Sequence, residues 1–211
     1  MTIQLYYAPG SSAFAPLVCL SEAEADFLAI RVVLANGEQH SDWFRAVSSR
    51  GRVPVLAVDG LVITETIAIL TYIAQQFPEA QLLPLASPIE LARAYELMAW
   101  LATGVHVTIA QLWRSERFVD DLNGKKSLEA AAHPRLERAF EEIEARIAGP
   151  WALDSGYSAL DPYLAVFLRW VTRLKMDIDS YPRWKAQNTR LFERKAVQNA
   201  LRIESVEIKT N

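Results

Sequence analysis

Cysteine is almost absent from this chain. Cys19 is the single cysteine among 211 residues. One cysteine excludes an intrachain disulfide, a CxxC redox pair and any zinc site built from several cysteines. Histidine is scarce too, and His40, His106 and His133 are too far apart in the sequence to show the spacing of metal ligands. The sequence therefore predicts a protein without a bound metal.

Long apolar runs and clusters of positive charge are also missing. No stretch approaches the roughly 18 uninterrupted apolar residues of a transmembrane helix. The opening residues Met1-Thr2-Ile3-Gln4-Leu5 lack the basic start and long apolar middle of a signal peptide. The 22 basic residues are scattered and the formal net charge is −3, which argues against a nucleic-acid partner. We expect a cytoplasmic protein that binds neither nucleic acid nor a membrane.

The chain does contain enough apolar residues for a large core. At 211 residues and 51% hydrophobic composition, one large or two smaller domains are expected. The first part mixes strand and helix signals. The elements expected there are a strand over 3–7, a helix over 13–25, a strand over 27–34, a short helix over 42–47, a hairpin over 53–64 and a helix over 66–77. This order predicts a small open α/β sheet with helices on its faces.

The segment 82–88 contains two prolines and cannot continue a helix. It is the predicted boundary between a domain of residues 1–80 and an all-α domain of residues 88–211. Helices are expected in the second domain over 89–113, 127–148, 158–174 and 184–201. At the start of the third helix, Ser158 and Asp161 fit a capping pattern, in which Ser158 accepts from the third residue's N–H and Asp161 reaches back.

A strand in the first domain opens with proline, at Val53-Pro54. Proline cannot donate to a strand ladder, so it belongs at a strand's start or edge, and Val53 then keeps a free backbone N–H and C=O at the end of the sheet. The Asp-Gly pair at 59–60 joins this strand to the next in a tight hairpin turn. Glu65, between two threonines, then opens a helix whose first N–H groups lack helical partners. These features predict a site for a small peptide-like ligand.

Four motifs carry a resemblance to a known family. They are Tyr6-Tyr7-Ala8-Pro9-Gly10, Gly51-Arg52-Val53-Pro54, Thr64-Glu65-Thr66-Ile67-Ala68-Ile69 with Tyr72, and Ser158 with Asp161. Each motif alone is weak evidence for a family. In this order and spacing, however, they resemble the bacterial glutathione S-transferases, most closely the beta class and its relatives. The resemblance runs from Leu5 to about Ile203.

The resemblance implies a thioredoxin-like N-terminal domain, an all-helical C-terminal domain, a homodimer and glutathione as co-substrate. It also implies that Val53–Pro54 is a cis peptide, although only about 5–6% of X–Pro bonds in folded proteins are cis. The Val53 backbone would pair with the cysteinyl part of glutathione as an added strand does. Glu65 would meet the γ-glutamyl ammonium, and Thr66 with the helix N–H groups would meet its α-carboxylate. The alternative for Glu65 and Thr66 is a first-turn acid and a helix cap.

The beta class typically carries a cysteine two residues after the glycine of the Pro-Gly turn, and this chain has Ser12 there. Mixed-disulfide chemistry is thereby lost and thiol activation remains. Lowering a thiol pKa from about 8.5 by ~2 units requires roughly 2.7 kcal/mol. A hydroxyl hydrogen bond supplies about 1.5–3 kcal/mol and a helix N-terminus roughly 0.3–1 kcal/mol. Ser12 is therefore the first candidate. Ser11, Tyr6, Tyr7 and backbone donors are the rivals, and a helix N-cap is the simpler role for either serine.

Other positions complete the expected site. Gln39, His40 and Arg52 are the candidates for the glycyl carboxylate. His106 falls near a histidine that several bacterial members place over the thiol, and the alternative is a structural or solvated histidine. The expected glutathione-binding set is Tyr7, Arg52, Val53, Pro54, Glu65 and Thr66, with Ser12, Ser11 and His106 as the catalytic candidates. Cys19 is expected in the core, with most large aromatics; one or two of Trp100, Trp113, Trp151, Phe167 and Trp170 would line the electrophile pocket.

The sequence therefore predicts a cytosolic glutathione transferase whose glutathione thiolate attacks an electrophilic carbon of a hydrophobic co-substrate bound between the domains. The alternatives are a non-catalytic glutathione or hydrophobic-ligand binding protein, a transferase-like partner module, glutathione-dependent peroxide or disulfide reduction, and isomerisation. For an isomerase, a basic residue soon after the serine pair is expected, and none occurs before Arg31.

Overall fold

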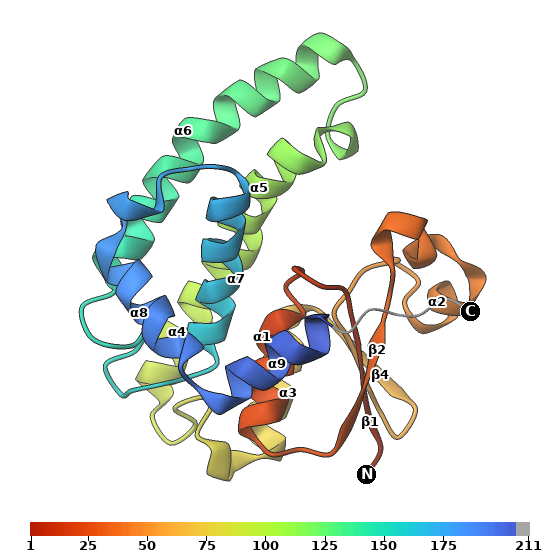
Figure 1. The fold of residues 1–211 in the computed structure, drawn as a ribbon, viewed down its shortest axis with the longest axis vertical. Helices are drawn as coiled ribbons and strands as arrows, with labels where there is room; N and C mark the ends of the chain where they lie inside the picture. The colour runs from red at the N-terminus through yellow and green to blue at the C-terminus, as the bar shows by residue number, and fades with distance from the viewer. Residues whose placement is uncertain (206–211) are drawn as a thin grey trace.

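The computed structural model describes residues 1–205, and Figure 1 shows a sheet with its helices followed by a larger group of helices. The first part contains β1 (Ile3–Tyr7), α1 (Phe14–Glu22), β2 (Phe27–Arg31), α2 (Asp42–Val47), β3 (Val55–Val58), β4 (Leu61–Thr64) and α3 (Thr66–Gln76). The second contains α4 (Pro88–Trp100), a π-helical segment (Leu101–Val105), α5 (His106–Trp113), α6 (Leu122–Arg146), α7 (Leu160–Arg173), α8 (Pro182–Phe192) and α9 (Lys195–Ser205). Residues 206–211 of the predicted domain 88–211 lie outside the described residues.

The sheet has the thioredoxin-like topology that the sequence predicts. Its strand order is β2-β1-β3-β4, with β1 parallel to β2 and antiparallel to β3, and β3 antiparallel to β4. The helix α1 makes the crossover between the parallel pair. The β3–β4 hairpin turns at Asp59 and Gly60, with φ of 47° and 84°, the positive values that a two-residue hairpin turn requires. The predicted α/β plus all-α fold is therefore confirmed.

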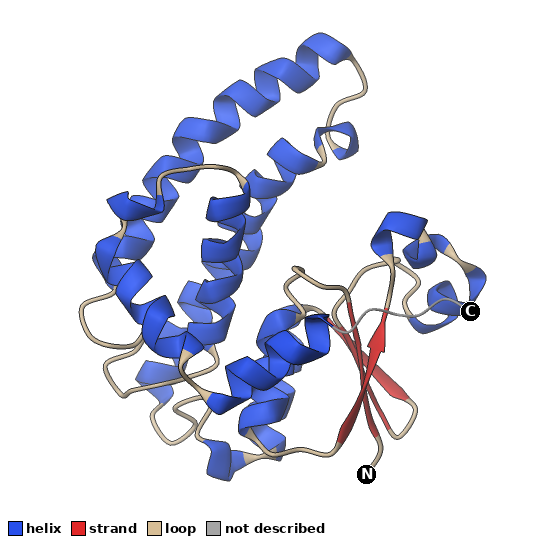
Figure 2. Cartoon of the chain, viewed as in Figure 1, coloured by secondary structure: helices blue, strands red, loops and turns tan. Residues whose placement is uncertain are grey.

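The two faces of the sheet are covered differently, as Figure 2 shows. On one face α1 packs against α3, α7 and α9, so the sheet and the helices share one continuous hydrophobic core. The other face forms a small separate cluster with α2, in which Tyr6 and Val55 pack around Phe44. The sheet domain is therefore joined to the helices through α1, the helix that follows the Pro9-Gly10 turn.

The start of α7 is fixed by a buried carboxylate. Asp161 has no exposed surface, and its Oδ2 accepts a hydrogen bond from the Ser158 N–H at 2.7 Å, as the capping pattern predicts. Its Oδ1 accepts from the Ala152 N–H and the Gln187 side-chain amide, both at 2.8 Å. The Ser158 hydroxyl differs from the prediction, because it accepts from the Leu160 N–H instead of the N–H three residues on. One carboxylate thus ties α7 to the preceding loop and to α8.

Several predicted helices have different bounds in the structure. The helix expected over 184–201 is two helices, because the chain turns at 193–194, where the Arg194 guanidinium binds Glu22 of α1. The helix expected over 13–25 ends earlier, since Glu24 adopts a left-handed φ of 48°. The helix α6 begins at Leu122, five residues before the predicted start, because Asp121 caps it by accepting from the Gly124 N–H at 2.7 Å.

The gap between α3 and α4 contains residues 82–87 of the predicted connector, and Pro88 is the first residue of α4. The exact division of the chain into domains stays a prediction. None of the helices formed by residues 1–205 has the length and apolarity needed to cross a bilayer.

Candidate active site

A cleft of about 600 Å³ lies between the sheet domain and the helices. Its size falls in the range of small-molecule sites. One wall consists of the turn before α1, the segment before β3 and the start of α3, and the other consists of α5, the turn after it and α7. Of the residues singled out from the sequence, those that line the cleft are Ser11, Ser12, Gln39, Arg52, Val53, Pro54, Glu65, Thr66, His106, Trp113 and Trp170.

The two serines before α1 have different partners. The Ser11 hydroxyl donates to the Ala8 carbonyl at 2.7 Å and accepts from the Ala13 N–H at 3.2 Å, so it stabilises the turn. The Ser12 side chain is 6% exposed, and its Oγ lies 3.2 Å from the Thr66 hydroxyl, which donates to it. In this arrangement the Ser12 proton remains available for a further bond, whereas the Ser11 proton is used.

The turn that carries these serines is held by the helices. The Gly10 N–H donates to Glu204 Oε1 at 3.0 Å, and its carbonyl accepts from Trp170 Nε1 at 2.9 Å. The Arg169 guanidinium pairs with the other Glu204 oxygen at 2.6 Å. Sequence reasoning missed this clamp. A signal for it was present in the sequence. Glu204 follows Ala200 by four residues and so lies on the same buried face of α9, where a carboxylate is unusual.

The Val53–Pro54 peptide is cis, as the resemblance implies. Within residues 1–205 the Val53 backbone forms no hydrogen bond, so its N–H and C=O are free at the end of β3, next to the cleft. Gly51 has a φ of 59°, and a Cβ there would lie 2.5 Å from the Gln39 carbonyl oxygen. Glycine at 51 thus lets the segment approach the turn that carries Gln39.

The start of α3 presents polar groups to the same end of the cleft. Glu65 adopts a φ of 70°, which is unusual for a residue with a side chain, and its carboxylate pairs with the Arg50 guanidinium at 2.6 Å. Both side chains are about two-thirds exposed, so this pair contributes little to stability. Thr66 is the first residue of α3, beside unpaired helix N–H groups. Arg50 was not predicted as a site residue.

On the opposite wall, His106 follows the π-helical segment, a feature often found at functional sites. Its ring centroid lies 4.9 Å from that of Trp170. Burial lowers the pKa of His106 from 6.5 and the positive charge of Arg52 lowers it further; Glu65 opposes this shift, and Arg117 adds the smallest lowering effect. The imidazole is therefore neutral at pH 7.

Some predicted residues are placed elsewhere. The prediction for Tyr7 needs correction, because its hydroxyl donates to the Ile203 carbonyl of α9 at 2.9 Å and the side chain does not line the cleft. Tyr6 packs with Phe44 on the other sheet face. His40 is exposed outside the lining. Cys19 is fully buried, and burial raises the pKa of its thiol.

Metal ligands do not cluster in the part of the chain that the structure describes: no group of three or more His, Cys, Asp or Glu side chains could hold an ion.

Comparison with known proteins identifies the family. Residues 1–75 match the family model "Glutathione S-transferase, N-terminal domain". The chain is 28% identical to glutathione S-transferase GstA of Escherichia coli O157:H7 over 97% of this chain and all of that protein. Some other relatives are named maleylacetoacetate isomerases.

Solved structures agree in fold. A glutathione transferase from Methylococcus capsulatus is 34% identical with a TM-score of 0.84, covering 96% of this chain and 98% of that one. A glutathione transferase homologue from Sulfitobacter, solved with bound glutathione, is 28% identical with a TM-score of 0.92, covering 97% and 99%. The fold, the cis Val53–Pro54 peptide beside the cleft and these matches agree, and the chain belongs to the glutathione S-transferase family.

Proposed function

We propose that this enzyme conjugates glutathione to a hydrophobic electrophile. The observation that carries the proposal is the convergence, at one end of the cleft, of the free Val53 backbone edge, the N-terminus of α3 and the Ser12 hydroxyl. These groups match the three parts of a short peptide that carries a carboxylate and a thiol. Glutathione is the co-substrate.

In the proposed pose the Val53 N–H and C=O pair with the cysteinyl residue. Thr66 and the first N–H groups of α3 hold the γ-glutamyl carboxylate, and Glu65 meets the ammonium. Arg52 and Gln39, which line the same cleft, meet the glycyl carboxylate. Gln39 suits this role, since its Oε1 is buried without a partner among residues 1–205 and the amide can reorient toward a ligand.

The pose places the thiol against the turn before α1. The Ser12 hydroxyl donates to the sulfur and favours the thiolate over the thiol. The thiol proton leaves to solvent, the sulfur forms a bond to the electrophilic carbon, and the leaving group departs with its electron pair. Neutral His106 adds a polar group to the wall on which the electrophile binds, without a charge that would compete for the sulfur.

The names of some relatives also suggest isomerisation, in which glutathione adds and leaves again. The serine pair lacks the basic residue soon after it that the sequence analysis expects of an isomerase, so conjugation is the preferred proposal. A non-catalytic binding protein would use the same pose without forming a thiolate.

Glutathione binding and thiolate formation test the proposal together. Calorimetry should give micromolar to millimolar affinity, about −8 to −4 kcal/mol, and an ultraviolet difference spectrum should show a thiolate band near neutral pH. Glu65→Gln keeps the side-chain shape and should weaken binding about tenfold, because the ammonium loses its charge partner. Glu79→Ala, an exposed acid outside the cleft, is the control. Binding without a thiolate band would favour the binding protein, and no heat at ~10 mM glutathione would overturn the assignment.

We also propose that the protein is a homodimer. Leu61 and Val62 are 76% and 46% exposed on β4, which is an edge strand, and Ile89 on α4 is 65% exposed. Exposed apolar side chains on an edge strand favour a protein partner. Light scattering should give twice the mass of the chain, and Leu61→Glu should shift it toward the monomer.

A further inference from the structure

The cleft contains more positive charge than the proposed pose of glutathione uses. Its only carboxylate among the described residues is Glu65, which already pairs with Arg50 at 2.6 Å. The arginines that line it are Arg50, Arg52, Arg114, Arg117 and Arg173. This excess of cations occurs in a chain whose formal net charge is −3.

These arginines divide between the two walls. Arg50 and Arg52 belong to the sheet domain, where the proposed pose places both carboxylates of glutathione. Arg114, Arg117 and Arg173 belong to the helical wall. Within residues 1–205 the guanidinium groups of Arg114 and Arg117 form no hydrogen bond or ion pair. The helical wall therefore presents cations that neither the protein nor the proposed glutathione pose neutralises.

The same wall carries a row of rings that leads to these cations. The His106 and Trp170 ring centroids are 4.9 Å apart, and those of Trp170 and Trp113 are 5.7 Å apart. The Arg173 guanidinium lies 5.2 Å from the Trp113 ring centroid. Arg114 directly follows Trp113 in the chain. The planes of the Trp170 and Trp113 rings are inclined by 77°, so a planar apolar group can stack on one ring and contact the other at its edge, with its far end at the arginines.

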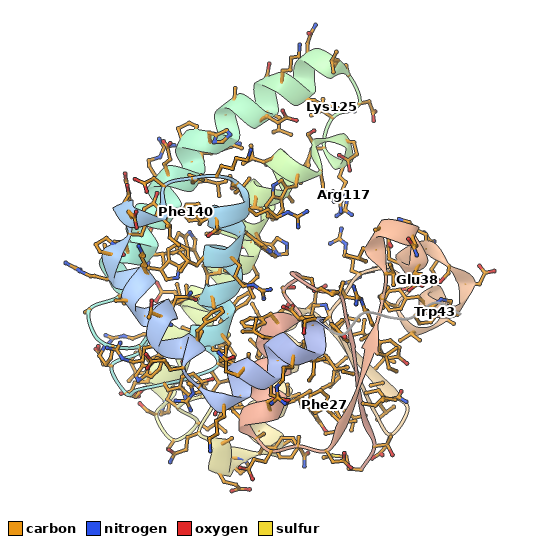
Figure 3. The ribbon with its side chains drawn as sticks, in the orientation of Figure 1. Phe27, Glu38, Trp43, Arg117, Lys125 and Phe140 are labelled. Carbon is orange, nitrogen blue, oxygen red and sulfur yellow. The ribbon has the colours of Figure 1, made fainter. Side chains whose placement is uncertain are left out.

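Arg117 lines the cleft on the side of the helices that faces the sheet domain (Figure 3). Figure 3 shows it below the turn between α5 and α6, on the side that faces the lobe with α2 and Glu38. Partial burial lowers the pKa of its guanidinium, and repulsion from Arg114 and Arg52 lowers it further. Three like charges close enough to repel one another are stabilised by an anion that binds among them.

We infer that the electrophile is a planar aromatic carboxylate, whose ring packs into the angle between Trp113 and Trp170 and whose carboxylate binds Arg114 and Arg117. The inference rests on the proposed function and specifies its substrate class. Arginine suits this role because its planar fork can pair with both oxygens of a carboxylate. Neutral hydrophobic electrophiles would use the rings alone.

A matched pair of substrates tests the inference. One is a para-chloro-dinitrobenzoate with both nitro groups beside the chlorine, and the other is its methyl ester. In both, the glutathione sulfur forms a bond to the ring carbon and chloride leaves with the bond's electron pair. After division by the uncatalysed rate, kcat/KM for the carboxylate should exceed that for the ester by about tenfold or more.

Substitutions locate the effect. Arg114→Met and Arg117→Met should each lower kcat/KM for the carboxylate about tenfold and leave the ester within about twofold, with the KM for glutathione unchanged. Arg138→Met, an exposed arginine of α6 outside the cleft, removes the same charge and should change neither. Equal losses on both substrates, no preference of the wild type for the carboxylate, or a rise in the KM for glutathione alone would overturn the inference.

Calorimetry with the two product conjugates gives a readout that needs no turnover. The carboxylate conjugate should bind about tenfold more tightly than its ester to the wild type, and equally to Arg117→Met. If neither substrate reacts but this difference is found, conjugation is wrong and the anion site stands. If both substrates react and no difference is found, conjugation stands and the anion site is wrong.

Discussion

The two walls of the cleft are constructed in different ways. The sheet-domain wall consists largely of backbone: the Pro9-Gly10 turn, the cis Val53–Pro54 peptide and the N-terminus of α3. The helical wall consists of side chains, chiefly rings and guanidinium groups. Backbone geometry suits a ligand that is the same in every reaction, and side chains on helices can be exchanged one at a time without changing the backbone. The comparison suggests that co-substrate binding and electrophile choice are physically separable here.

The largest expected effect comes from destabilising the helical wall at the start of α7. Asp161→Ala should lower the free energy of unfolding by roughly 3–5 kcal/mol, because two buried donors, from Ser158 and Gln187, and one partly buried donor, from Ala152, lose their acceptor. Urea denaturation measures it. Asp121→Ala removes the exposed cap of α6 and should cost only about 1 kcal/mol.

An unchanged urea midpoint for Asp161→Ala, accompanied by lost turnover, would show that the carboxylate belongs to the chemistry. Burial also raises the pKa of Asp161. The folded protein therefore takes up this proton more readily than the unfolded chain, so the wild type should lose some stability as the pH rises through that pKa, and Asp161→Asn should lack this slope.

The second test removes the contact between Glu204 of α9 and the Gly10 turn of the sheet domain. Glu204→Ala should lower the free energy of unfolding by about 2–3 kcal/mol, because the Gly10 N–H and the Arg169 guanidinium both lose their acceptor. Hydrogen exchange should show faster loss of the Gly10 amide proton in this variant. Glu204→Gln keeps an acceptor oxygen and should retain much of the protection. Equal protection of Gly10 in Glu204→Ala would contradict the clamp.

The third prediction sharpens the role of the sheet-domain wall. Ser12→Ala should raise the pKa of bound glutathione by about 1–2 units and lower turnover ten- to a hundredfold at neutral pH, with glutathione affinity nearly kept. Ser11→Ala is the matched control, because the Ser11 proton is already donated to Ala8. The pH profile of conjugation to an aryl halide decides between them. If neither variant moves the profile, backbone N–H groups and the α1 dipole activate the thiol.

The smallest expected effect is the electrostatic coupling between the two walls. His106 should titrate below 6.5, and Arg52→Met and Arg117→Met should each raise its pKa, since both guanidinium groups repel the protonated ring from opposite walls. Nuclear magnetic resonance of the ring protons measures this directly. Because the folded pKa is lowered, stability associated with His106 is present above about 6.5 and is lost as the pH falls through the folded pKa. Because His106 and Arg117 share the helical wall, a His106 pKa that Arg52→Met leaves unchanged would show two electrostatically independent walls.

Local signals in the sequence predicted most of the sheet-domain wall. The Asp59-Gly60 turn, the Val53-Pro54 strand start and the polar opening of α3 each act within a few residues, so their chemistry is visible in order along the chain. Tyr7 shows the limit of this reasoning. A strand pattern says that its ring and that of Tyr6 point to opposite faces, and it does not say which element covers each face.

The helical wall depended on contacts that no local pattern contains. Arg114 and Arg117 were counted among scattered charges, because only the packing of α5 and α7 brings them to the same cleft as Arg173. The break between α8 and α9 was missed for the same reason. The break lies at 193–194, and Arg194 there pairs with Glu22, a contact between residues 172 positions apart.

The clamp on Gly10 also sets an order of events when the protein is made. Gly10 and Glu204 are 194 positions apart, so a nascent chain has long completed β1 to α3 before α9 leaves the ribosome. Domains generally begin to fold from the N-terminus during synthesis. The sheet can therefore form early, yet the Gly10 turn receives its Glu204 anchor only after the helical wall has been synthesised. This turn is therefore held in its final position only once the last described helix has joined the sheet domain.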